Sequence, residues 1–260
     1  MTPIGLSEIA DNQHKDQHWF GGGFPDALLS GSEETAKQWL DDFIRSYVER
    51  DLAYLFGVEL LSATLRNFWR MLAHSNGNVW NAEVFARSLG ISAPTVLRYT
   101  GFLEGGYMIR RLQPWFVNAK KRLIKSPKVY IRDTGILHRL LFIENGEDLF
   151  GHPAVGASWE GYVIEQIAQR LSRGLELFYY RTQAGAECDL VLVRGITPIA
   201  CIEIKLSNAP TVSRGFISCT EDLQPLHKFI ITPGSETYTT AHAVTVIGLT
   251  EFMEQELGKI

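Results

Sequence analysis

Apolar positions recur at helical spacing along the first part of the chain. In the stretch SEETAKQWLDDFIRSYVERDL, which starts at Ser32, apolar residues follow one another at i, i+3, i+4 and i+7. Ser32 is suited to cap this helix, with Glu33 and Glu34 in its first turn. A second apolar stripe runs through residues 61–72, and HSNGN at 74–78 is typical of a loop. The pattern predicts a helical segment over residues 1–76.

Residues 77–134 have a different pattern, in which two short helices precede two strands. NAEVFARSLG ends in a glycine suited to a left-handed helix end, and ISAPTVLRYTGFLEGG begins a second helix with Ser92 as its cap and Pro94 in its first turn. YMIRRL and KVYIR look like strands. This order predicts a winged helix-turn-helix whose wing, defined here as residues 118–128, has the sequence NAKKRLIKSPK.

Residues 135–260 combine helix and strand patterns, so the fold class expected for the whole chain is α/β (α+β). The stretch GASWEGYVIEQIAQRLS, residues 156–172, predicts a helix. On its wheel Glu160 falls within the apolar stripe, whereas Glu165 falls on the polar side. Because a buried carboxylate without a partner is unfavourable, we expect a cation near Glu160.

Charges also interrupt the apolar hairpin AECDLVLVRGITPIACIEIKLS, which starts at residue 186 and turns at residues 195–198. Strict alternation places Asp189 on one face of the first strand with Glu187 and the valines at 191 and 193, and places Glu203 and Lys205 on one face of the second. Folding back about the turn brings Asp189 within about one residue of lying opposite Glu203.

Two carboxylates and an ammonium on one strand face, with Glu160 from a helix, predict a site for Mg²⁺ or Mn²⁺, since these ions take oxygen ligands. Asp189, Glu203 and Glu160 are the expected ligands, and Lys205 is placed to assist an attacking water. The alternative is a buried ion-pair cluster that serves structure alone, although burying several charges is rarely favourable.

Charge is unevenly distributed, which changes what the formal net charge of −4 implies. Residues 105–132 hold eight basic side chains and no acidic one. Such segregation is typical of a surface that binds a polyanion. The residues expected to contact DNA are Thr95, Arg98 and Tyr99 on the second helix and Lys120, Lys121, Arg122, Lys125 and Lys128 on the wing. The alternative is a small domain that packs against another protein, with its lysines solvated.

Several classes of protein are disfavoured. The chain has no apolar run of membrane-spanning length and no secretory leader, so a cytoplasmic protein is expected. The P-loop string GxxxxGK followed by Ser or Thr does not occur, and GGGFP at 21–25 is interpreted as a turn. Three cysteines without a CxxC pair indicate buried, reduced thiols.

The order Glu, Asp, Glu-x-Lys on a helix and a hairpin resembles the PD-(D/E)XK nuclease superfamily, with Cys188 in place of the usual proline before the aspartate. The resemblance implies that Asp189 and Glu203 bind the metal and that Lys205 assists catalysis. The strings GGFP, YVERDL, LGISAPTVLRY, LQPWFVNAKKRLIKSPKVYIRDTG, GASWEGYVIEQ, YRTQAGAECDLVL and IEIKLS resemble the carboxy-terminal half of a prokaryotic AAA-type ATPase family. That family's complete members begin with a P-loop ATPase module, so this chain is not expected to hydrolyse ATP by itself.

The function expected from these observations is DNA binding combined with Mg²⁺-dependent hydrolysis of phosphodiester bonds. The alternative is a non-catalytic module that binds DNA or protein and acts with a separate AAA-type ATPase.

Overall fold

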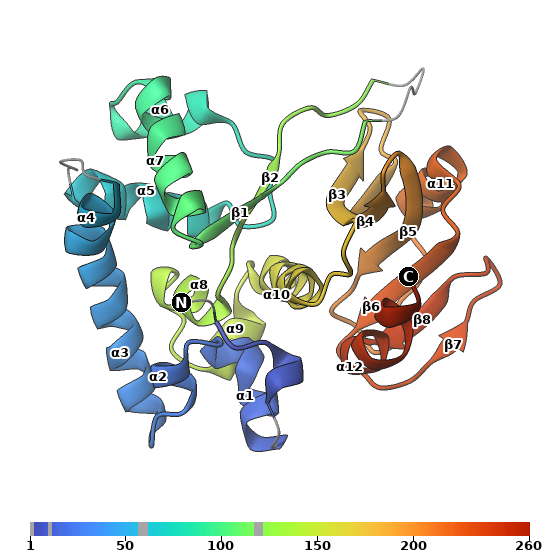
Figure 1. The fold of residues 1–260 in the computed structure, drawn as a ribbon, viewed down its shortest axis with the longest axis horizontal. Coiled ribbons are helices and arrows are strands. Elements are labelled where there is room, and N and C mark those ends of the chain that lie inside the picture. Colours follow the sequence, from blue (N-terminus) through green and yellow to red (C-terminus); the bar gives the residue numbers. More distant parts are fainter. Residues whose placement is uncertain (1–2, 10–11, 57–61, 117–121) are drawn as a thin grey trace. The chain divides into compact units, whose positions relative to one another are not determined.

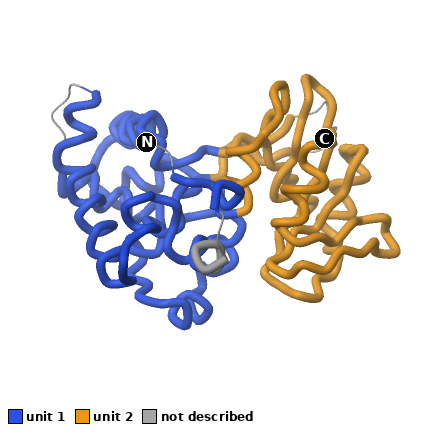
Figure 2. Tube along the Cα trace, turned by 60° about the horizontal axis from the view of Figure 1, so that its bottom comes forward, with its two compact units in different colours: residues 1–111, 129–162 blue, residues 112–128, 163–260 orange. Residues whose placement is uncertain are grey.

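The computed structural model of the protein describes residues 3–9, 12–56, 62–116 and 122–260. The chain forms two compact units, the first made of residues 1–111 and 129–162 and the second of residues 112–128 and 163–260 (Figure 2). These units divide the chain at other points than the three predicted ranges, 1–76, 77–134 and 135–260, and that three-part division stays a prediction. No helix in the described ranges is both long and apolar enough to cross a bilayer.

The first unit is helical (Figure 1). Its helices are α1 (Asn12–Gly21), α2 (Pro25–Leu28), α3 (Glu33–Ser46), α4 (Leu52–Phe56), α5 (Ser62–His74), α6 (Ala82–Leu89), α7 (Ala93–Gly105), α8 (Thr134–Leu140) and α9 (Gly146–Gly151). A π-helical turn, Tyr47–Asp51, joins α3 to α4. Ser32 caps α3 as predicted, because its side chain accepts a hydrogen bond from the Thr35 amide at 3.1 Å. The predicted apolar stripes of α3 and α5 lie in the core of this unit.

Helices α6 and α7 form the predicted pair joined by a tight turn. Gly90 ends α6 in the left-handed conformation, with a φ of 66°. Ser92 caps α7 by accepting a hydrogen bond from the Thr95 amide at 3.3 Å. Strands β1 (Ile109–Leu112) and β2 (Lys128–Ile131) then pair with each other, so the strands flanking the predicted wing are present.

The glycines at 21–23 form a turn that requires glycine. Gly22 has a φ of 77°, and a Cβ atom there would lie 2.3 Å from the Asp133 carboxylate. Asp133 is 4% exposed and accepts hydrogen bonds from the Gly23 amide at 2.8 Å and the Ile136 amide at 2.9 Å. It therefore joins the glycine turn to the start of α8, which explains GGGFP without a phosphate.

The second unit contains a six-stranded mixed sheet in the order β3-β4-β5-β6-β8-β7. The strands are β3 (Leu175–Arg181), β4 (Glu187–Arg194), β5 (Thr197–Ile204), β6 (His227–Thr232), β7 (Tyr238–Thr239) and β8 (Thr245–Gly248). Strands β3, β4 and β5 are antiparallel, whereas β5, β6 and β8 are parallel. Helix α11 (Arg214–Leu223) connects β5 to β6 and packs on β4 and β5. The predicted mixture of helices and strands is confirmed.

Three further helical segments complete the chain. Helix α10 (Val155–Gln169) precedes β3 and contributes residues to both units. After β8 the chain ends in α12 (Leu249–Glu251), a π-helical turn (Phe252–Glu256) and a 3-10 turn (Leu257–Lys259). Another 3-10 turn, Leu6–Glu8, precedes α1.

The described residues between β1 and β2 lie along β3 within the second unit. The Trp115 amide donates to the Tyr179 carbonyl at 2.7 Å, and the Ile124 amide donates to the Arg181 carbonyl at 3.0 Å. The described part of the wing thus extends the edge of the sheet. The sequence grouped the wing with the α6–α7 helix pair. In the structure, the described part of the wing belongs to the second unit, because these hydrogen bonds join it to β3.

Candidate active site

A bulge interrupts the β3–β4 ladder at Asp189. The flanking pairs are Phe178 with Val191 and Tyr180 with Cys188. The two-residue step from Phe178 to Tyr180 on β3 is therefore matched by a three-residue step from Val191 to Cys188 on β4. Cys188 and Val191 pack in the same apolar cluster, although residues three apart on a regular strand point to opposite faces. Bulges re-aim side chains and are frequent beside active sites. The predicted strict alternation over residues 187–193 is wrong across this bulge.

Asp189 and Glu203 lie on adjacent strands near the ends of the hairpin. Leu190 pairs with Ile202, so Asp189 and Glu203 each lie one residue beyond this pair on the two strands of the hairpin. The Asp189 Oδ2 atom accepts a hydrogen bond from the Ile204 amide at 2.9 Å. This bond fixes the aspartate carboxylate beside the backbone of the strand that carries Glu203.

Glu203 is 5% exposed, and its two carboxylate oxygens differ. Oε1 lies 2.9 Å from the Lys205 ammonium. Oε2 is buried and has no hydrogen-bond partner within the part of the chain that the structure describes. Leaving a buried acceptor unsatisfied costs about 1–3 kcal/mol, and such atoms are frequent at functional sites. A buried carboxylate oxygen of this kind is chemically able to coordinate a cation.

Lys128 lies among the acidic side chains of β4. It is 3% exposed, and its Nζ atom lies 3.5 Å from Glu187 Oε1 and 3.8 Å from Asp189 Oδ1. Arg181 also approaches Glu187, at 3.6 Å. The predicted contact of Lys128 with DNA phosphates stays a prediction, and the structure places its side chain buried against these carboxylates. Its sequence neighbourhood gave no sign of this, since the partners come from a strand about sixty residues away.

The other residues expected to bind DNA differ in how exposed their side chains are. Tyr99 is 3% exposed and packs near the Phe68 ring, and its predicted contact with DNA stays a prediction. Its spacing from Val96 and Leu103 was a helical signal for burial. The Thr95 hydroxyl lies 2.8 Å from that of Ser92. The side chains that are exposed are Arg98, Arg122 and Lys125, whereas Lys120 and Lys121 lie outside the described residues.

Helix α10 carries the remaining predicted ligand. Glu160 belongs to the first unit, is half-buried and accepts a hydrogen bond from the Tyr130 hydroxyl. Its participation with Asp189 and Glu203 stays a prediction, because those residues belong to the second unit. Glu165, which falls on the polar side of the wheel, is 3% exposed.

The three cysteines are buried and free, as expected from the sequence. Cys188, Cys201 and Cys219 place their sulfur atoms within 4.8 Å of one another. Among the described residues, no other set of three or more His, Cys, Asp or Glu side chains meets this distance. Burial raises the pKa of the Cys188 thiol. The hairpin therefore offers two neighbouring carboxylates and a lysine, without a third carboxylate at that spacing in the described ranges.

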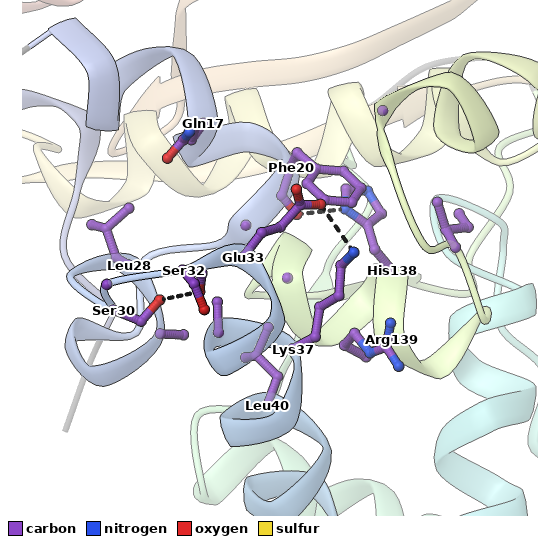
Figure 3. Close-up of a pocket in the computed structure, with 17 residues that line it drawn as sticks. Gln17, Phe20, Leu28, Ser30, Ser32, Glu33, Lys37, Leu40, His138 and Arg139 are labelled. Carbon is purple, nitrogen blue, oxygen red and sulfur yellow. Dashed lines mark hydrogen bonds and ion pairs between the residues drawn. The ribbon is translucent and has the colours of Figure 1, made fainter.

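A cavity of about 430 Å³ lies in the first unit (Figure 3). Its lining includes Glu33 and Lys37, which form an ion pair at 3.0 Å, and Arg139, which is paired with acidic residues. His138 also lines it; burial lowers the pKa of this histidine to about 4, so the ring is neutral at pH 7. The cavity holds none of the predicted ligands.

Comparison with known proteins identifies the family to which the chain belongs. Residues 12–147, more than half of the chain, match the family described as Domain of unknown function (DUF8612). The chain belongs to the DUF8612 family. Residues 155–252 of this DUF8612 protein also match the family described as Domain of unknown function (DUF4143).

Two curated relatives come from mycobacteria. They are Uncharacterized protein Rv2008c of Mycobacterium tuberculosis and Uncharacterized protein Mb2031c of Mycobacterium bovis, each 41% identical over 232 residues. The alignment covers 89% of this DUF8612 chain and 52% of each relative, so the chain spans about half the length of these relatives. No solved structure matches it significantly.

Proposed function

We propose that the second unit carries a divalent-cation-dependent site that hydrolyses phosphodiester bonds in DNA, with Asp189 and Glu203 as cation ligands. The observation that carries the proposal is the buried, unpartnered Oε2 atom of Glu203 beside the fixed carboxylate of Asp189. Carboxylate oxygens are the ligands that Mg²⁺ and Mn²⁺ prefer, so these residues fit such an ion. The resemblance to the PD-(D/E)XK superfamily also implies Glu160 as a ligand, and that assignment stays a prediction.

The charges around the hairpin suit a phosphodiester substrate. Three carboxylates, those of Glu187, Asp189 and Glu203, are balanced by the cations of Lys128, Arg181 and Lys205. A bound divalent cation adds two positive charges, polarises a phosphoryl oxygen and lowers the pKa of its water. The site then attracts the negatively charged phosphate.

Each side chain has a separate task in this proposal. Asp189 presents its carboxylate in an orientation fixed by the Ile204 amide. Lys205 is half-exposed, with 39% of its side chain accessible, so its ammonium can leave Glu203 Oε1 and donate to the substrate phosphate or orient the attacking water. Lys128 balances the charge of the two β4 carboxylates from inside the unit.

DNA is the proposed substrate because two features point to it. The α6–α7 pair has the order of a helix-turn-helix, and Arg98 on its second helix is exposed. Arg122 and Lys125 are also exposed, in a segment rich in basic residues. The finer fold assignments that we propose, a winged helix and a PD-(D/E)XK nuclease-like domain, agree with this substrate.

The test is cleavage of linear, supercoiled and branched DNA by the purified chain with Mn²⁺ or Mg²⁺. Asp189→Asn, Glu203→Gln and Lys205→Met should each abolish cleavage. Glu176→Gln is the matched control, because Glu176 is an exposed glutamate on the neighbouring strand β3. Equal cleavage by all five proteins, or cleavage that is insensitive to a chelator, would contradict the proposal.

A second candidate is a non-catalytic module that binds DNA or protein together with a separate AAA-type ATPase. The observation that favours it is the Lys128 ammonium, which already gives Asp189 a cation at 3.8 Å. In this case DNA binding should be independent of Mg²⁺, and the chain should co-purify with a P-loop protein. Retention of DNA binding in Glu203→Gln without any cation dependence would favour this candidate.

A further inference from the structure

The three cysteines of the chain converge from separate elements. Cys188 lies on β4, Cys201 on β5 and Cys219 on α11, and they are 1%, 0% and 0% exposed. Their sulfur atoms lie within 4.8 Å of one another. The sequence contains no other cysteine, so every thiol of the protein is in this one cluster.

From this convergence we propose that Cys188, Cys201 and Cys219 form a binding site for a single thiophilic cation of the Cu(I) or Zn(II) type. A metal–sulfur bond of about 2.3 Å implies that the sulfurs of a three-coordinate site lie about 4 Å apart. The observed limit of 4.8 Å requires shifts of less than about 1 Å to reach that geometry. Soft sulfur ligands select such ions over Mg²⁺, so this site is chemically distinct from the carboxylates of the hairpin.

The surroundings favour a low coordination number. The side chains packed in the same cluster are apolar and include Val191, Phe216 and Ile230. Among the described residues, no histidine or carboxylate joins the three sulfurs within the same distance. Cu(I) accepts three sulfur ligands, whereas structural Zn(II) commonly takes four, so the two ions should differ in their fourth ligand.

The cation would join three elements of the second unit. Each thiol that binds as thiolate releases one proton to solvent. The ion then links β4, β5 and α11 at a point next to Asp189 in the chain and two residues before Glu203. Loading should therefore raise the melting temperature of the protein, because the ion binds the preformed cluster of the folded state more tightly than the unfolded chain. Packing by itself accounts for single buried cysteines but does not require all three to meet.

The test uses the full chain and both ions, prepared anaerobically under reducing conditions. Cu(I) and Zn(II) are each offered to the native protein and during refolding, since the thiols are buried, and chromophoric chelators report the bound ion. The wild type should retain one ion per chain, and X-ray absorption should show three sulfur ligands at about 2.3 Å. Excess Mg²⁺ should not displace the ion.

Variants distinguish the cluster from other ligands. Cys219→Ser should weaken binding by more than the roughly tenfold to hundredfold cost of losing an outer-shell partner. The cysteine-free protein, with alanine at all three positions, should retain no ion. Binding that survives in the cysteine-free protein overturns the proposal, and so does a wild type that takes up neither ion by either route. X-ray absorption on the wild type shows whether three sulfur atoms bind the ion, so the proposal can be tested even where a variant fails to fold.

Discussion

Replacing Glu203 by methionine should stabilise the protein while destroying its proposed function. The buried Oε2 atom has no hydrogen-bond partner in the described structure, and leaving a buried acceptor in this state costs about 1–3 kcal/mol. The ion pair that Oε1 makes with Lys205 returns less than about 1 kcal/mol, because the lysine is 39% exposed. Methionine has a similar length and needs no polar partner.

The expected gain is therefore about 1–2 kcal/mol in the free energy of unfolding, measured without divalent cations. At about 2–4 °C per kcal/mol, this corresponds to a rise of about 2–8 °C in melting temperature. Chemical denaturation and calorimetry of Glu203→Met beside the wild type measure the change. Glu176→Met, at an exposed position of β3, is the control and should shift stability by less than about 0.5 kcal/mol.

A loss of 1 kcal/mol or more in the free energy of unfolding of Glu203→Met would contradict this prediction, since it would mean that the buried carboxylate is satisfied in the folded protein. The wild type should also gain stability when Mg²⁺ or Mn²⁺ is added, whereas Glu203→Met should not. Keeping a buried charge that function requires lowers the stability of the protein, which is a common trade-off between stability and activity.

Three further predictions concern the rest of the chain. Burial lowers the pKa of His138 to about 4, so the unfolded state binds more protons than the folded state below pH 6.5. The free energy of unfolding should therefore fall by up to about 3 kcal/mol as the pH drops from 6.5 to 4. Denaturant titrations should show a flatter pH profile in His138→Gln than in the wild type, and equal profiles would contradict this prediction. Asp133→Ala removes two hydrogen bonds to backbone amides and should cost about 2–4 kcal/mol in the same titrations; a loss below about 1 kcal/mol would show that the glycine turn holds without it. Reversing Lys120, Lys121 and Arg122 to glutamate should weaken DNA binding at all sequences and reduce its salt slope by up to about 2.7; unchanged affinity would remove the wing from the DNA surface.

Local signals in the sequence predicted the elements that depend on local interactions. Ser32, Ser92 and Gly90 are helix-end residues whose roles follow from their neighbours in the chain, and all three act as predicted. The β4–β5 hairpin follows equally from its alternation and its turn, which is why Asp189 and Glu203 could be placed on adjacent strands.

Features that depend on contacts between residues far apart in the sequence could not be predicted from local patterns. The bulge at Asp189 arises from pairing with β3, and the burial of Lys128 arises from its contacts with β4. The cysteine cluster brings together residues separated by 13 and 18 positions on three elements. Tyr99 is different, because its helical spacing from buried neighbours was visible in the sequence and outweighs its proximity to basic residues.

The most direct measurement is Mn²⁺ binding followed by electron paramagnetic resonance, because it tests the proposed cation site without knowledge of the preferred DNA. Wild type, Glu203→Gln and the exposed-site control Glu176→Gln should be titrated side by side. We expect a bound Mn²⁺ signal in the wild type and in the control, where Mg²⁺ displaces it, and no bound signal in Glu203→Gln. Equal binding by all three proteins, or none in the wild type, would contradict the claim that Glu203 is a cation ligand.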